Sequence, residues 1–123
     1  ASVTQALTID FASVANYFVH HGWKTGEPVA VEAVAIANYQ SALLNQLEPP
    51  TLTLAQHSQD GLSPAARYPQ TLPAMPLRLE GEEGDEYWLG FNNFYTITRY
   101  NHSHRYAMAV YQLSQLIRER VGE

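Results

Sequence analysis

Residues 76–91 read PLRLEGEEGDEYWLGF and carry the clearest structural signal in the chain. Leu77 and Leu79 alternate with Arg78 and Glu80, as side chains do on the two faces of a strand. A Gly-rich acidic segment follows, and the apolar run Tyr-Trp-Leu returns after it. This is the pattern of two antiparallel strands joined by a tight turn, so the segment predicts a hairpin in a small antiparallel sheet.

Two amphipathic helices are predicted at the ends of the chain. Residues 10–22 show apolar side chains at helical spacing between a capping Asp10 and a terminating Gly22, and residues 103–120 repeat the pattern after a capping Ser103. Each helix has an apolar stripe that needs a partner. The two helices can pack on each other, or they can be parts of a larger helical body into which the sheet is inserted.

The segments between these helices are predicted from shorter patterns. Prolines between residues 62 and 76 exclude a long regular element there. The other predicted elements are a strand at 29–35, a short helix that ends at Asp60-Gly61, and a third strand at 92–100, where Phe94, Thr96 and Thr98 alternate with Tyr95, Ile97 and Arg99. Residues 36–47 have helical periodicity, and the sequence EPP ends whatever element they form.

Length and composition restrict the class of protein. A chain of 123 residues with 46% hydrophobic and 15% charged residues is one globular domain. Its net charge of -5 argues against nucleic acid and against an anionic membrane surface as partners. There is no cysteine, no apolar run of about 20 residues that could span a membrane, and no N-terminal pattern of an intact signal peptide.

Few motifs in the sequence support catalysis. Without cysteine or a Gly-x-Ser-x-Gly elbow, a covalent nucleophile has no basis, and no Gly-rich loop cradles a phosphate. The acidic turn at 80–86 does not fit a calcium loop, and His102-x-His104 is too short for a zinc site. We therefore expect no metal, no cofactor and a solvated acidic turn.

Residues 93–106, NFYTITRYNHSHRY, concentrate aromatic rings and hydrogen-bonding groups next to the last helix. Tyr100 and Tyr106 flank a loop that carries Asn101, so two rings and an amide can converge on one spot. Such groups suit a flat polar ligand such as a sugar. The alternative is that the tyrosines pack in the core and that Asn101 caps a turn.

Two blocks of the sequence resemble the C-terminal third of the membrane-bound lytic murein transglycosylase B family. They are ANYFVHHGWKTGEPVAV, within residues 10–31, and YWLGFNNFYTITRYNHSHRYAMAVYQL, within residues 86–117. The resemblance implies an α+β fold in which N- and C-terminal helices of a lysozyme-like core flank a small inserted antiparallel β-sheet domain. Residues 1–28 and 100–123 would be the helical core portion and residues 29–99 the inserted sheet domain.

The resemblance also implies a site. Matched position by position, Tyr17 in ANYF, Tyr100 and Asn101 in RYN, and Tyr106 at the start of the last helix would line a glycan groove. The partner is then a peptidoglycan glycan strand in the periplasm or at the outer membrane of a Gram-negative bacterium. We expect no nucleic acid and no membrane contact from this segment, and a homodimer or helix swap is one expected way to cover the exposed core helices.

Enzymes of this family cleave the bond between MurNAc and GlcNAc without water and leave 1,6-anhydro-MurNAc, using one glutamate as acid and then as base. In the family that glutamate and a calcium-binding loop lie upstream of the segment matched here. The resemblance therefore implies the C-terminal part of a lytic transglycosylase that contributes groove residues, has no catalytic residue and is inactive alone. The alternatives are a non-catalytic peptidoglycan- or protein-binding module, and a diverged enzyme that uses Glu32 or Glu86.

Overall fold

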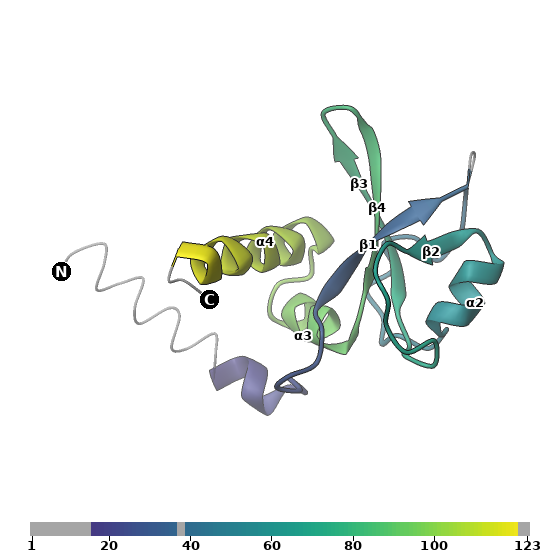
Figure 1. Cartoon of the computed structure of the whole chain (residues 1–123). Helices are drawn as coiled ribbons and strands as arrows, with labels where there is room; N and C mark the ends of the chain where they lie inside the picture. Colours follow the sequence, from purple (N-terminus) through teal and green to yellow (C-terminus); the bar gives the residue numbers. More distant parts are fainter. Residues whose placement is uncertain (1–15, 37–38, 121–123) are drawn as a thin grey trace.

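The computed structural model describes residues 16–36 and 39–120, with side chains up to residue 116. A helical turn at 16–20 precedes the labelled elements. These are β1 (Ala30–Ala35), α2 (Leu54–Gln59), β2 (Leu62–Pro64), β3 (Met75–Gly81), β4 (Gly84–Gly90), α3 (Asn92–Tyr100) and α4 (His104–Arg120). Figure 1 shows α3, α4 and the helical turn on one side of the sheet and α2 on the other.

The four strands form one antiparallel sheet in the order β2-β1-β4-β3. The hairpin predicted at 76–91 is confirmed as β3 and β4, which pair Leu77 with Trp88 and close with Gly81 opposite Gly84. Gly84 has a φ of 124°, a conformation that side chains with a Cβ rarely adopt, so the turn needs glycine at this position. The strand predicted at 29–35 is confirmed as β1, which lies between β4 and the short β2.

Alternation along the strands gives the sheet two buried faces. On one face Ala30, Leu77 and Trp88 pack against α3 and α4, in a cluster that includes Phe94, Ile97, Ala107 and Met108. On the other face Val31 and Leu89 pack against α2 and the loops around it, together with Tyr39, Leu54, Leu62, Ala74 and Phe91. Because helices and loops cover both of its faces, the four-stranded sheet lies at the centre of the molecule.

The prediction of a third strand at 92–100 is wrong, because these residues form the helix α3. The same residues fit a helix because Phe94, Ile97 and Thr98 recur at spacings of three and four and are all buried. The hydroxyls of Thr96 and Thr98 donate to the carbonyl oxygens of Asn92 and Tyr95, at 3.1 and 2.6 Å. These bonds satisfy the threonines inside the helix, so burial overrides their preference for strands.

The helical periodicity of residues 36–47 does not produce a helix in the described part of this segment, which is a loop with a turn. Asn45 explains the irregular path, because its φ of 59° is not helical. Its side chain accepts a hydrogen bond from the amide of Arg78 at 2.9 Å and donates to the carbonyl of Arg78 at 3.1 Å. The loop thus supplies partners to the open edge of β3, which a helix here could not do.

The predicted terminal helices agree with the structure where it describes them. Residues 16–20 are helical, Gly22 has a φ of 101°, and the earlier part of the predicted helix, from residue 10 to residue 15, lies outside the described residues. The hydroxyl of Ser103 accepts a hydrogen bond from the amide of Tyr106 at 3.1 Å, as expected of a cap. The short helix before Asp60-Gly61 is confirmed as α2.

Apolar side chains remain exposed on both terminal helices, as predicted. Val19 is 68% exposed, Leu113 50% and Leu116 57%. Whether a second copy covers them, and whether the sheet is a domain inserted between residues 28 and 100, stay predictions. Among the described residues, none of the helices has both the length and the apolar character needed to cross a membrane.

Candidate functional site

The site predicted from the sequence begins with Tyr17 and Tyr100, which lie 83 positions apart in the chain and touch in the structure. Their ring centroids are 5.3 Å apart, and the ring planes meet at 75°. The hydroxyl of Tyr17 donates to the carbonyl oxygen of Arg99 at 2.9 Å, which ties the helical turn to the last residues of α3. Tyr17 is partly exposed and Tyr100 is 43% exposed, so neither ring is sealed in the core.

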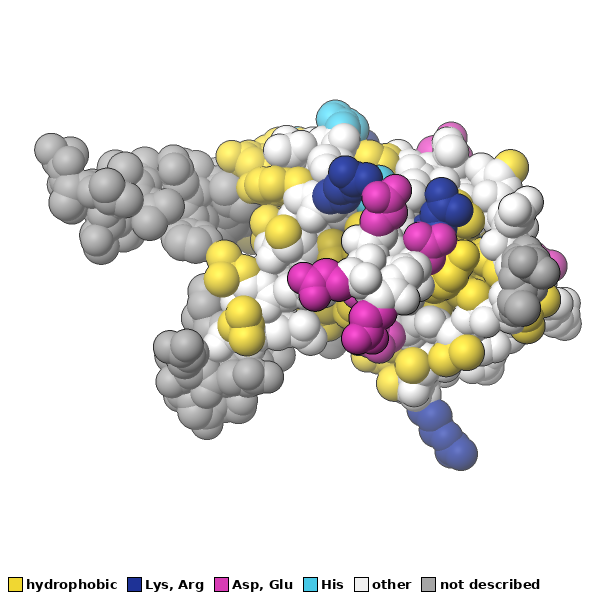
Figure 2. All heavy atoms as spheres, turned by 90° about the horizontal axis from the view of Figure 1, so that it is seen from above, with side chains coloured by type: hydrophobic (Ala, Val, Ile, Leu, Met, Phe, Trp, Pro, Cys, Tyr) yellow, Lys and Arg dark blue, Asp and Glu magenta, His cyan; other side chains and the backbone are white. Residues whose placement is uncertain are grey.

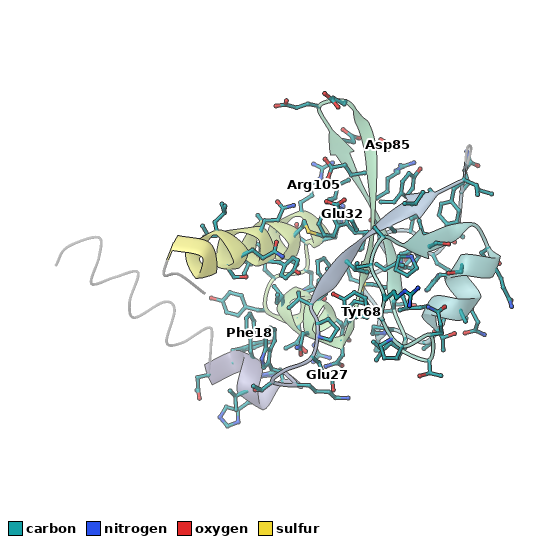
Figure 3. All side chains as sticks on the ribbon, viewed as in Figure 1. Phe18, Glu27, Glu32, Tyr68, Asp85 and Arg105 are labelled. Carbon is teal, nitrogen blue, oxygen red and sulfur yellow. The ribbon has the colours of Figure 1, made fainter. Side chains whose placement is uncertain are left out.

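The ring of His21 is the third ring of this surface. The ring of His21 stacks on Tyr17 with centroids 3.7 Å apart and planes within 7°, and its Nδ1 lies 2.7 Å from the carbonyl oxygen of Tyr17. Phe18 stacks on Trp23 and makes a T-shaped contact with Tyr100. It also packs against the core cluster of α3 and α4, so it connects the rings to the core. Figure 3 shows Phe18 on the side of the helical turn that faces these two helices.

Asn101 directly follows Tyr100 on the connection from α3 to α4, and Tyr106 lies in the first turn of α4. The backbone of Asn101 is extended and ends α3, and its carbonyl accepts a hydrogen bond from the amide of Ser103 at 2.7 Å. Its side chain is exposed and makes no hydrogen bond to the described residues. Tyr106 is 36% exposed in the first turn of α4, and within the described part of the chain its ring does not contact Tyr17 or Tyr100.

Two asparagines that the sequence did not mark as functional, Asn92 and Asn93, fix the segment that follows Tyr17. Asn93 is fully buried at the start of α3, where its Oδ1 accepts from the amide of Lys24 at 2.8 Å. Its Nδ2 donates to the carbonyls of Lys24 and Glu27, at 2.9 and 3.1 Å. Asn92 donates to the carbonyl of Gly22 at 2.8 Å. These bonds hold the loop after the helical turn on α3; the sequence signal was the polar pair NN inside an otherwise apolar segment.

Cations dominate the charge near the loop from α3 to α4. The hydroxyl of Tyr95 raises the pKa of Arg99, and that of Tyr17 adds to the effect. Burial lowers the pKa of His104, and the charge of Arg105 lowers it further. Elsewhere, burial raises the pKa of the Tyr39 phenol, behind the sheet.

The side chains of the described carboxylates are all exposed, and two of them, Glu80 and Glu86, line a hollow with Arg105. The full set is Glu27, Glu32, Glu48, Asp60, Glu80, Glu82, Glu83, Asp85 and Glu86. On the face seen from above, Figure 2 shows acidic side chains in magenta next to Lys and Arg side chains in dark blue. In the same described part of the chain, histidine and carboxylate side chains nowhere form a group of three able to hold a metal ion. The site is therefore a surface of rings and hydrogen-bonding groups, suited to binding a polar ligand.

Comparison with known proteins identifies the family of the chain. Residues 6–115 match the family described as the Transglycosylase SLT domain. Membrane-bound lytic murein transglycosylase B of Escherichia coli K12 is 46% identical over 105 residues, which are 85% of this chain and 28% of that protein.

Two solved structures from Pseudomonas aeruginosa are also similar. Catenated lytic transglycosylase SltB1 has a TM-score of 0.78 at 40% identity, over 89% of this chain and 36% of that one. SltB3, solved in complex with NAG-NAM-pentapeptide, has a TM-score of 0.62 at 29% identity, over 78% of this chain and 26% of that one. The chain thus spans about a third of the length of the relatives it matches. It belongs to the transglycosylase SLT domain family, with lytic murein transglycosylase B among its relatives, and it shares their lysozyme-like α+β fold class.

Proposed function

We propose that this chain supplies one wall of the peptidoglycan groove of a lytic transglycosylase, with Tyr17, Tyr100, Asn101 and Tyr106 as the residues that contact the glycan. The contact between Tyr17 and Tyr100 carries the proposal, because it joins residues from opposite ends of the chain into one partly exposed aromatic surface. Sugar rings stack on aromatic faces, and tyrosine hydroxyls and an amide can bond to hydroxyl and acetamido groups. The side-chain amide of Asn101, which has no hydrogen-bond partner among the described residues, directly follows Tyr100 and can take the second role.

The proposal assigns the general acid to polypeptide other than the described residues. A glutamate that donates a proton to a glycosidic oxygen near neutral pH needs a raised pKa, and burial is the usual cause. Every described glutamate is exposed to water, including Glu32 and Glu86. The residues described here would therefore bind and orient the glycan, while another part of a longer protein would cleave the bond between MurNAc and GlcNAc.

The relatives support this division of roles. The Escherichia coli relative is named a murein transglycosylase, and SltB3 was solved with NAG-NAM-pentapeptide, while this chain covers 28% of the first and 26% of the second. We infer the same substrate class, peptidoglycan, for this chain. We also infer a location in the Gram-negative cell envelope, in the periplasm or next to the outer membrane.

Binding of a neutral chitooligosaccharide tests the groove. Tyr100→Ala is expected to raise the Kd for chitotetraose about five- to tenfold, because a lost stacking contact costs on the order of 1 kcal/mol. Tyr106→Ala should give a smaller rise in the same direction. Isothermal titration of the 123-residue chain measures both, with Leu113→Ala as a control that removes exposed apolar surface from α4. Unchanged Kd values in both tyrosine variants would contradict the groove and favour a packing role.

Activity on purified cell walls tests the missing acid. The chain alone is expected to release no anhydro-muropeptides, as measured by chromatography of the soluble products. A non-catalytic binding module would also be inactive, so this measurement separates the stand-alone enzyme from the other two hypotheses. Release of anhydro-muropeptides that is abolished by Glu32→Gln or Glu86→Gln would overturn the proposal in favour of a stand-alone enzyme.

A further inference from the structure

The guanidinium of Arg99 lies beside the proposed glycan wall. Arg99 directly precedes Tyr100 and is exposed in the last turn of α3. Its Nη1 donates to the hydroxyl of Tyr95 at 3.4 Å, and its Cζ lies 6.0 Å from the centre of the Tyr95 ring. The Tyr17 hydroxyl, which bonds to the carbonyl of Arg99, is near enough to add to the raised pKa of the guanidinium. The Tyr95 hydroxyl is thus a hydrogen-bond partner of the guanidinium, and the Tyr17 hydroxyl bonds to the backbone of the same residue.

Arg99 has no anionic partner in the described part of the chain. None of the described carboxylates lies within ion-pair distance of it. The sequence explains this, because residues 87–118 contain Arg99, Arg105, Arg118 and two histidines but neither aspartate nor glutamate. In a chain with a net charge of -5, residues 87–118 are the longest segment without an acidic residue, and they include most of the proposed glycan wall.

We propose that Arg99 is a specificity residue that binds a carboxylate carried by the muramic acid units of the glycan, an inference that rests on the proposed function of the wall. GlcNAc is neutral, whereas MurNAc carries a lactyl group that ends either in a carboxylate or in a peptide with carboxylates of its own. The planar guanidinium fork matches a carboxylate in a bidentate geometry. Because the guanidinium already bonds to Tyr95, the side chain of Arg99 loses less conformational entropy when it binds a carboxylate. The aromatic wall accepts any sugar ring, and Arg99 favours the acidic one.

Three ligands separate the two sources of the carboxylate. Chitotetraose carries none, NAG-NAM carries the lactyl carboxylate, and NAG-NAM-pentapeptide carries those of the peptide. Isothermal titration at low salt is expected to show that Arg99→Gln raises the Kd about fivefold or more for at least one of the two muramic acid ligands. For chitotetraose the change should stay below twofold. An effect confined to NAG-NAM assigns the lactyl carboxylate, and one confined to the pentapeptide assigns the peptide.

Arg105→Gln is the matched control, since it removes the same charge from the first turn of α4. Arg105 lines a hollow between the hairpin and α4, together with Glu80 and Glu86, and Figure 3 shows it on the hairpin side of the molecule. Equal losses in the Arg99 and Arg105 variants, or an equal loss for chitotetraose, would overturn the inference. If Tyr100→Ala leaves the Kd of every ligand unchanged, the proposed wall itself fails. If Tyr100→Ala weakens all three ligands while Arg99→Gln weakens none, only the role of Arg99 fails.

Discussion

Asn93→Ala is expected to lower the free energy of unfolding by about 3–5 kcal/mol, one of the largest effects of any single substitution in this chain. The side chain is fully buried, and it satisfies one amide and two carbonyl groups in the loop from Lys24 to Glu27. Alanine removes the partner of the Lys24 amide and of the Glu27 carbonyl, while the Lys24 carbonyl keeps only its bond from the Glu27 amide at 3.2 Å. Urea denaturation followed by circular dichroism measures the change.

Two other variants make the interpretation of Asn93→Ala specific. Asn93→Asp keeps the shape and the acceptor for the amide of Lys24, but it places an oxygen against two carbonyl oxygens, so it should destabilise at least as much as alanine. Asn92→Ala removes a single bond from a half-buried residue and should cost about 1 kcal/mol. A loss below about 1 kcal/mol for Asn93→Ala would show that the loop holds its position without this side chain.

The same residue links stability to the site. Tyr17 precedes the loop by only a few residues, so its contact with Tyr100 depends on where the loop is held. A protein weakened at Asn93 but still folded should therefore bind glycan less tightly than the wild type. Asn93 would thus affect glycan binding through the position of Tyr17, without contacting the ligand itself.

The parts of the fold that the sequence predicted are those in which local pattern and tertiary burial agree. The hairpin combines period-two alternation with a Gly-rich turn, and both survive in β3 and β4. The cap at Ser103 and the left-handed Gly22 likewise act within a few residues of themselves. Signals of this short range do not depend on the rest of the chain.

The parts of the fold that the sequence did not predict depend on partners that lie far away in the sequence. Residues 92–100 fit period two and helical spacing equally well, and only the buried surface beneath Phe94 and Ile97 selects the helix α3. The segment 36–47 has helical spacing, but Asn45 is held in a left-handed conformation by bonds to Arg78, 33 positions later. A single sequence gives no direct sign of such contacts.

The candidate site divides in the same way. Composition and the resemblance named Tyr17, Tyr100, Asn101 and Tyr106, and the structure brings the first two into contact. It leaves Tyr106 one turn into the next helix, without a ring partner among the described residues. The residues that build the surface from below, Asn92 and Asn93, could not be recognised because their role depends on backbone groups about 70 positions away.

Phe94→Ala is expected to be comparably severe, with a loss of about 3–5 kcal/mol in the free energy of unfolding. Phe94 is fully buried in the cluster that joins the sheet to α3 and α4. Removing the ring leaves a cavity whose walls belong to three different elements, so it cannot collapse easily. The measurement is again urea denaturation, with Phe94→Leu as a milder variant that should lose about 1 kcal/mol.

Gly90 turns this prediction into a test of packing. A Cβ on Gly90 would lie 2.9 Å from the Cδ1 of Phe94 and 3.2 Å from the Cδ1 of Leu77, so Gly90→Ala alone should cost about 1–3 kcal/mol. In the Phe94→Ala background the ring that obstructs this Cβ is absent, so the same substitution should cost less than half as much. Strictly additive losses would mean that Gly90 is required for its backbone and not for the close approach of α3 to β4. A smaller cost of Gly90→Ala in the Phe94→Ala background would instead show that Gly90 is required for the close approach of the Phe94 ring to β4.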